Sequence, residues 1–507
     1  MHKQWFKVKD VDVFISHSWS SSRWEKYLAV CYFLNLGLAA KAMLASVLLS
    51  EIFMLICPEV SIHVVFWLLL DFPVVVFFLV FFFGQHLTCG IWGPRFWVDR
   101  LCVDQTDETT KTEGIAGLPT IVANSSAFLV FWDKSYFKRL WCNFEVSIFV
   151  KSNGLRSLHL VPLWLTPWLL TTMLLSYASA RLISAFSEFD PSFVVDNTSN
   201  FQGVEGDALA FGLRRVYEYA LQTETYVLFC APPLLVGLVS FQKKLDGHRD
   251  MLESMNSFDV RSAKCAVEHD RLVIEAQVAE LFDGLEDPII AVPIEAENSG
   301  EGDDERQELI DMSLTYSARL AVRSVTGFAT HEGCLEEFNK YVRGPLRDAV
   351  VADLGDVTDI PYTVCMLAGF PYTLSYPPIL WAGKHTWHAF GYRSEFEYVA
   401  VGFTELLFFV VVSPAAYPYL LRCVKYLDES FDSGLWRAAA SCGCGWLTFS
   451  IVQLENSAAA ALLDSFIILQ HPAFLCFFVL AVVAAMFQHY MLFGSGWQRK
   501  SSREVGM

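Results

Sequence analysis

The sequence predicts a multi-pass α-helical membrane protein that carries a cytosolic α/β module with a parallel sheet. Of the 507 residues, 54% are hydrophobic, which exceeds the usual share in soluble domains. These residues are concentrated in long runs, and a helix needs about 20 apolar residues to cross a bilayer. The α/β module is predicted because short apolar strands alternate with helical stretches in the N-terminal third, an order typical of parallel sheets.

Eight runs are long and apolar enough to be membrane spans. Clusters of Lys and Arg follow the second, fourth, sixth and eighth runs, and all of them face the cytosol if eight spans are counted. This count predicts an integral membrane protein with its N- and C-termini in the cytosol. A buried core helix is the alternative for the fifth run, which has no charge but four prolines. The predicted spans are 38–57, 62–83, 159–180, 225–241, 360–383, 399–421, 435–454 and 472–493.

The charge distribution argues against a nucleic-acid partner and distinguishes residues 242–359 from the rest of the chain. The net charge is −18, whereas a nucleic-acid partner would need clustered Lys and Arg residues at its phosphates. Residues 242–359 carry 26 acidic and 12 basic residues, and their apolar spacing predicts a mainly helical, acidic cytosolic segment. No metal is expected, because the 13 cysteines form no CxxC pair and no HExxH motif appears. No required cofactor is expected, because no Gly-rich phosphate-binding loop appears.

The α/β module is predicted from apolar runs that end in small polar residues and are followed by helical stretches. The run 158–164 is either a fourth strand or the beginning of a membrane helix. Gly37 is the predicted end of the first helix. The predicted strands are 10–19, 96–103 and 127–133, and the predicted helices are 21–37, 114–126 and 136–152.

Two membrane spans separate the first helix of this module from its second strand. A two-span hairpin begins and ends on the same membrane face, so it can be inserted without breaking a soluble fold. The predicted organisation is then a module at 10–37 and 95–155, an inserted hairpin at 38–83, a two-helix membrane segment at 159–241 with an outer loop at 181–224, the acidic segment 242–359, a four-helix membrane segment at 360–493 and a basic tail at 494–507.

Three stretches of the module carry a family resemblance. "VFISHSW" (13–19), "FWVDRLCVDQTD" (96–107) and "RLWCNFE" (139–145) occur in this order. Together they resemble a Toll/interleukin-receptor (TIR)-like domain, in the variant found in multi-pass proteins of unicellular algae and other protists. The resemblance implies a flavodoxin-like parallel sheet. It also implies two further strand–helix units, which are missing, remodelled or supplied by 242–359.

Some TIR domains cleave the nicotinamide–ribose bond of NAD⁺, and the resemblance implies that Glu145 matches their catalytic glutamate. A carboxylate can stabilise the positive charge that develops on the ribose. Trp141 lies one helical turn earlier on the same face, and the loop 104–117 would close over the ligand. The residues implied to bind NAD⁺, as a substrate, are Ser16, His17, Ser18, Asp104, Gly114 and Trp141.

Structural roles are the alternatives for these residues. Glu145 is otherwise a solvated helix residue or the partner of Lys138 or Arg139. Trp141 is otherwise a core residue, and His17 otherwise holds the end of its strand by a hydrogen bond.

Three functions follow, and each has its own structural cue. The first is a membrane-tethered signalling module that associates with itself or with other proteins, which needs only a surface. The second is a membrane-anchored NAD⁺ hydrolase, which needs Glu145 in an open pocket. The third is a transporter or channel, whose cue is paired charges inside the membrane. Asp71, Glu405 and Asp464 are the candidates for such pairs.

Overall fold

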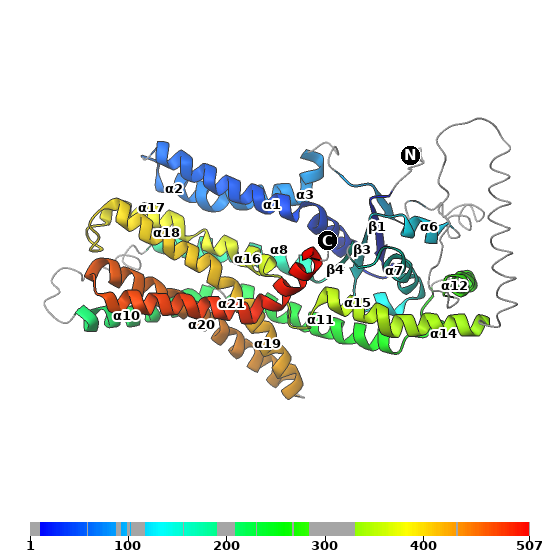
Figure 1. Ribbon diagram of the computed structural model, residues 1–507. Coiled ribbons are helices and arrows are strands. Elements are labelled where there is room, and N and C mark those ends of the chain that lie inside the picture. Colours follow the sequence, from blue (N-terminus) through cyan, green and yellow to red (C-terminus); the bar gives the residue numbers. More distant parts are fainter. Residues whose placement is uncertain are drawn as a thin grey trace. The chain divides into compact units, whose positions relative to one another are not determined.

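The computed structural model describes residues 11–57, 59–87, 93–98, 102, 117–155, 157–189, 208–229, 231–265, 268–282, 330–431 and 434–505 (Figure 1). The chain forms two compact units, and each consists of three chain segments. The sheet unit contains Met1–Lys26, Gly93–Leu163 and Asp246–Leu354, and the helical unit contains Tyr27–Trp92, Trp164–Leu245 and Gly355–Met507.

The sheet unit is built on a four-stranded sheet in which all described strand pairs are parallel. Its order is β2-β1-β3-β4, so that β1 and β3 lie in the centre. Strands are observed within the predicted ranges 10–19 and 127–133, and the run 158–164 contains a fourth strand. The predicted strand 96–103 is confirmed over 96–98; Cys102 is not in a strand, and 99–101 and 103 lie outside the described residues. The predicted span 159–180 is therefore wrong at its beginning, because a strand precedes the helix there. The strands are β1 (Val13–His17), β2 (Phe96–Val98), β3 (Ala127–Trp132) and β4 (Leu158–Pro162).

Stacked aromatic rings form the core on one face of this sheet. The Phe14 ring lies 4.6 Å from the Trp97 ring and 5.1 Å from the Phe128 ring, measured between centroids. Phe149 of helix α7 (Leu140–Asn153) stacks on Phe128 at 5.0 Å. Helix α7 therefore covers this face (Figure 1), and helix α6 (Leu118–Ala123) joins the same core.

Most of the described part of the acidic segment 242–359 belongs to the sheet unit, from Asp246 to Leu354, while its two ends, 242–245 and 355–359, belong to the helical unit. Its apolar side chains enter the same core as the strands and α7. The backbone also connects them, because Leu140 N–H donates to the Lys264 carbonyl at 3.0 Å and Lys264 N–H donates to the Lys138 carbonyl at 2.9 Å. Its helices are the end of α11 (Ala231–Asn256), α12 (Glu268–Leu281), α14 (His331–Tyr341) and α15 (Arg347–Leu354).

The helical pitch changes at Gly344 and Pro345. A π-helical turn, Val342–Leu346, joins α14 to α15. Pro345 has no N–H group and its ring crowds the preceding turn of an α-helix. A locally wider turn accommodates such a residue while the helix continues.

The helical unit begins with helix α1 (Arg23–Ile56), which is continuous for 34 residues. The predicted helix end at Gly37 is wrong. A glycine in a helix interior costs only about 1 kcal/mol, and apolar residues continue the helix on both sides. The next helix is also continuous, from Ile62 to Leu87, and contains a π-helical turn at Trp67–Asp71.

Among the described residues, five helices are long and apolar enough to cross a membrane. They coincide with the first, second, sixth, seventh and eighth predicted spans, and their length and composition are compatible with a multi-pass membrane protein. They are Arg23–Ile56, Ile62–Leu87, Glu395–Ser430, Gly434–Leu469 and Pro472–Gly494. Glu395–Ser430 comprises α18 (Glu395–Val412) and α19 (Ala416–Ser430), which a short 3₁₀ turn joins, while α20 is Gly434–Leu469 and α21 is Pro472–Val505.

The other predicted spans differ from the helices observed. The run 360–383 forms two shorter helices, and its prolines at 377 and 378 lie in the first turn of the second one, where a missing N–H costs least. The outer loop expected at 181–224 is helical at both of its ends. The helices are α8 (Leu165–Phe189), α10 (Ala208–Phe229), α16 (Tyr362–Thr373) and α17 (Tyr376–Gly383).

We expect Gly84→Ala to weaken the packing of the first two membrane-length helices. A Cβ atom at Gly84 would lie 2.7 Å from Oδ1 of Asn35, whose amide donates to the Phe81 carbonyl at 2.9 Å. Moving this buried amide breaks that bond, which costs about 1–3 kcal/mol. The thermal midpoint of the purified protein should fall. Gly37→Ala is the control, because its Cβ meets nothing within 4 Å; equal midpoints for the two variants would contradict the prediction.

Candidate functional site

A hydrogen-bonded chain of three side chains lies at the carboxyl end of β1. Ser16 Oγ donates to Oε2 of Glu145 at 2.5 Å, and the Tyr136 hydroxyl lies 2.6 Å from the same Ser16 Oγ. A serine hydroxyl has one hydrogen, and Ser16 uses it toward Glu145. Tyr136 is therefore the donor to Ser16, and the chain runs from Tyr136 through Ser16 to the carboxylate.

Local structure explains how these three residues meet. Ser16 follows Phe14 on the same face of β1, because alternate residues of a strand share a face, and that face packs against α7. Glu145 lies in the middle of α7, and Tyr136 belongs to a 3₁₀ turn, Tyr136–Lys138, just before it. The apolar core thus places Glu145 above the end of the central strand.

All three side chains are buried. Glu145 is only 8% exposed, Ser16 is 1% exposed and Tyr136 is fully buried. Burial, together with the nearby Cys142 and Glu145, raises the pKa of Tyr136 well above its ordinary value. Tyr136 therefore keeps its proton at physiological pH and continues to donate to Ser16.

A second polar group lies next to this chain and centres on Ser18. Its Oγ lies 3.1 Å from Oγ of Ser135 and accepts a hydrogen bond from Arg139 at 3.2 Å. Asp133 accepts from the Ser135 hydroxyl at 2.7 Å. These contacts tie the turn after β1 to the turn after β3, at the edge of the sheet where ligands of parallel sheets bind.

The structure brings some of the predicted site residues together. Ser16 meets Glu145, and Ser18 meets Arg139 in the adjoining group. Strand side chains alternate between faces, which places His17 opposite Ser16. Trp141 is half-buried and packs edge-on against Phe144, with ring centroids 6.4 Å apart. Asp104 and Gly114 lie outside the described residues, as does all of the loop 104–117 except Gly117.

Tyr136 was missed in the sequence, although it is the residue that extends the chain from Glu145. The local pattern "SYFKRLW" does not distinguish a tyrosine with a buried, hydrogen-bonded hydroxyl from an ordinary aromatic core residue. Arg139 and Lys138 are the alternative partners predicted for Glu145. The side-chain contacts described for them are instead with Ser18 for Arg139 and, at 3.9 Å, with Asp250 for Lys138.

The chemistry open to this site is proton donation and hydrogen bonding by a buried carboxyl–hydroxyl chain. Glu145 holds Ser16 and Tyr136 in place in the conformation described. Reaction at a ribose would need the carboxylate to face a ligand. Within the described part of the chain, no three His, Cys, Asp or Glu side chains gather closely enough to hold a metal ion.

The helical unit contains three acidic residues inside membrane-length helices, and each has polar partners. Asp71 accepts a hydrogen bond from the Tyr177 hydroxyl at 2.7 Å and lies 3.6 Å from Nε of Arg181. Glu405 and Asp464 come from different helices, α18 and α20, and their carboxyl groups lie within hydrogen-bonding reach of each other. All three acids that the sequence marked as candidates therefore have polar partners in the structure.

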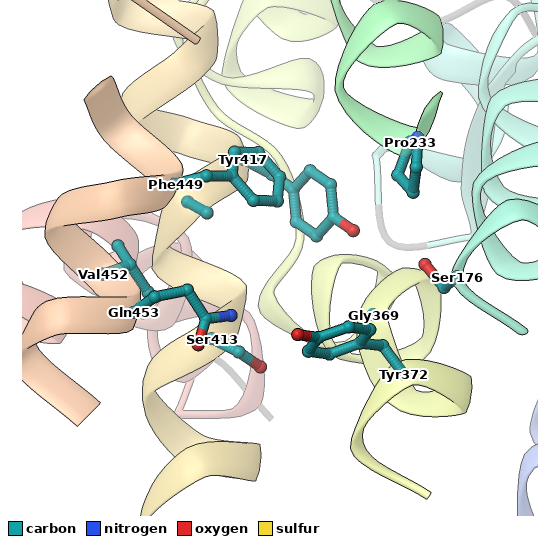
Figure 2. Close-up of a pocket in the computed structure, with 10 residues that line it drawn as sticks. Ser176, Pro233, Gly369, Tyr372, Ser413, Tyr417, Phe449, Val452 and Gln453 are labelled. Atoms are coloured by element: carbon teal, nitrogen blue, oxygen red, sulfur yellow. The ribbon is translucent and has the colours of Figure 1, made fainter. Parts of the chain in front are cut away.

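A small cavity also lies in the helical unit, between α8, α11, α16, α19 and α20 (Figure 2). Its volume is about 30 Å³, which is room for one or two water molecules and far less than a metabolite needs. Tyr372, Tyr417 and Gln453 line it from different helices. We interpret it as a small packing defect with a mostly apolar lining, and not as a ligand site.

No protein-family model matches the chain, and neither a curated protein nor a solved structure is similar enough to match it.

Proposed function

We propose that this chain is a multi-pass membrane protein whose sheet unit is a cytosolic, TIR-like signalling module that works by protein–protein association. The proposed orientation places both termini and the sheet unit in the cytosol. In this role the helical unit anchors the module at a membrane, and the module offers a surface to a second copy of the chain.

The strand order supports the flavodoxin-like part of this proposal. In the flavodoxin-like order 2-1-3-4-5 the first strand lies between the second and the third. The observed order β2-β1-β3-β4 is the same for the first four strands. The helices of 246–354 pack on this sheet, in keeping with the alternative that this segment supplies the rest of the module.

The burial of Glu145 is the observation that carries the choice between association and catalysis. A glutamate that orients a ribose must face an open site, whereas Glu145 is 8% exposed and accepts a hydrogen bond from Ser16. A fixed, enclosed carboxylate suits a structural role. The signalling function then needs no chemistry at this position.

Two measurements on the full-length protein in liposomes test the proposal. We expect energy transfer between copies labelled with donor and acceptor dyes, which unlabelled protein competes away. We also expect no nicotinamide release from NAD⁺, whether by the wild type or by Glu145→Ala. Release by the wild type that the variant lacks, with its fold intact, would establish the hydrolase instead. Absence of energy transfer at all protein densities would contradict association.

Transport is the second candidate function, and the paired membrane charges favour it. Charged groups inside a membrane are costly and usually mark a pathway for ions or protons. The contact between Glu405 and Asp464 is the kind of charge pairing that the transport hypothesis requires, and the sequence alone could not show it. Flux of a cation or of protons into sealed proteoliposomes, reduced in Glu405→Gln, would support this function.

A further inference from the structure

The Glu405–Asp464 pair lies in a network of tyrosine hydroxyls and one arginine. Tyr219 of α10 donates to Oδ2 of Asp464 at 2.8 Å, and Tyr392 donates to Oδ1 of the same residue. Tyr376 of α17 donates to Oε2 of Glu405. Three of the four carboxylate oxygens therefore have a hydroxyl donor.

The fourth carboxylate oxygen has no hydroxyl donor in the described part of the chain. Oε1 of Glu405 is fully enclosed, and no N–H or O–H group among the described residues donates to it. The Asp464 carboxyl group is within hydrogen-bonding reach of Glu405, but an ionised carboxylate can only accept. A proton placed between the two carboxyl groups would supply the missing donor.

The charge count leads to the same result. Arg215 of α10 donates to the Tyr219 hydroxyl at 3.4 Å and is only 5% exposed, and Asp464 is only 4% exposed. Glu405 is half-buried. Two ionised carboxylates beside one guanidinium leave an excess negative charge in a largely enclosed network, which is unfavourable. One bound proton makes the network neutral.

We propose that Glu405 and Asp464 form a proton-binding site inside the membrane segment, in which the two carboxyl groups share one exchangeable proton. Close carboxyl pairs elsewhere hold a proton in this way, because two like charges in contact cannot both persist in a medium of low dielectric. The site binds its proton whether or not the chain also moves protons across the membrane.

A metal ion fits the same residues less well. Hard cations take about six oxygen ligands in proteins, and no three His, Cys, Asp or Glu side chains among the described residues gather closely enough to hold one. A proton between Glu405 and Asp464 leaves every one of the tyrosine hydrogen bonds in place.

Other titratable groups near the pair are few among the described residues. Arg215 and Tyr219 face it from α10, Tyr376 from α17, Tyr392 from the segment before α18 and Tyr398 from α18 itself. Farther along α20, Glu455 interacts with Gln488 and His489 of α21. It lies nine residues before Asp464, about 13 Å along the helix axis, so it belongs to a separate environment.

Infrared difference spectroscopy of the full-length protein in lipid tests this site directly. The carbonyl stretch of a protonated carboxyl group is separate from that of a carboxylate and shifts in heavy water. We expect the wild type to show such a band at neutral pH and to lose it reversibly at alkaline pH. Glu405→Gln should lack the band, because its amide donates to Asp464 in place of the proton. Asp71→Asn is the matched control and should keep it, since Asp71 faces Arg181 rather than a second acid.

Several results would overturn the proposal. It fails if the wild type has no protonated-carboxyl band at neutral pH, and this needs no variant to fold. It also fails if Glu405→Gln, with an unchanged elution profile and circular dichroism spectrum, keeps the band, or if Asp71→Asn loses it. The spectrum can show the bound proton when no flux is measurable, so failure of transport and failure of the site are distinguishable.

Discussion

Replacing Phe338 by alanine should destabilise the whole sheet unit, including strands that lie far from it in the sequence. Phe338 of α14 is fully buried, and its ring lies 4.9 Å from that of Phe282 and 5.7 Å from that of Phe258, between centroids. Removing a buried phenylalanine side chain costs about 3–5 kcal/mol. The same core contains Phe14 and Phe128 of the strands, so the loss should be shared by the sheet.

Hydrogen exchange on the full-length protein in lipid measures this effect peptide by peptide. We expect faster exchange in α14 and also in β1 and β3 of the Phe338→Ala variant. Leu272→Ala is the control, because Leu272 of α12 is 65% exposed and its truncation should change little. If exchange accelerates only within 246–354 while the strands keep their protection, the acidic segment is an independent domain and our description of the unit is wrong.

The contact between this segment and the sheet could not be predicted from the sequence, whereas the strands could. The strands were predictable because short apolar runs followed by polar residues have few other uses, as in "VFISH", with three apolar residues before Ser and His, and "AFLVFW", with six apolar residues before Asp133. The contact of Lys151 Nζ with the Leu281 carbonyl, at 3.0 Å, joins α7 to α12. No local pattern encodes such a pairing, because it arises from packing across segments that membrane helices separate in the chain.

Physical reasons also explain why the predicted helix end at Gly37 was wrong and why the acidic candidates in the apolar runs could be found. Gly37 resembled a helix end because glycine favours that position, yet the apolar residues around it were enough to continue α1. Asp464 and Glu405 were marked as unusual because charges are rare in apolar runs. Their contact depends on how α18 and α20 pack, and sequence spacing within one helix carries no information on that.

We expect the second large effect at Glu145, where a structural role and a catalytic role predict different results. Glu145→Ala removes the acceptor of the Ser16 hydroxyl and leaves it, with Tyr136 behind it, in a buried site. A buried polar group without a partner costs about 1–3 kcal/mol. We therefore expect Glu145→Ala to lower the unfolding free energy of the sheet unit by that amount, measured by hydrogen exchange in β1 and α7. Glu253→Ala, at an exposed position of α11, is the control and should change it little.

Two milder variants separate the roles. Glu145→Gln keeps a side-chain oxygen that can accept from Ser16, so most of the stability should return. Tyr136→Phe removes only the hydroxyl that donates to Ser16, and its cost should be about 0.5–1.5 kcal/mol. A structural Glu145 thus predicts a graded loss of protection from Gln to Ala and no effect on NAD⁺ in either variant. Unchanged exchange in Glu145→Ala would show that the Ser16 bond contributes nothing to folding. The burial of this carboxylate would then need a functional cause.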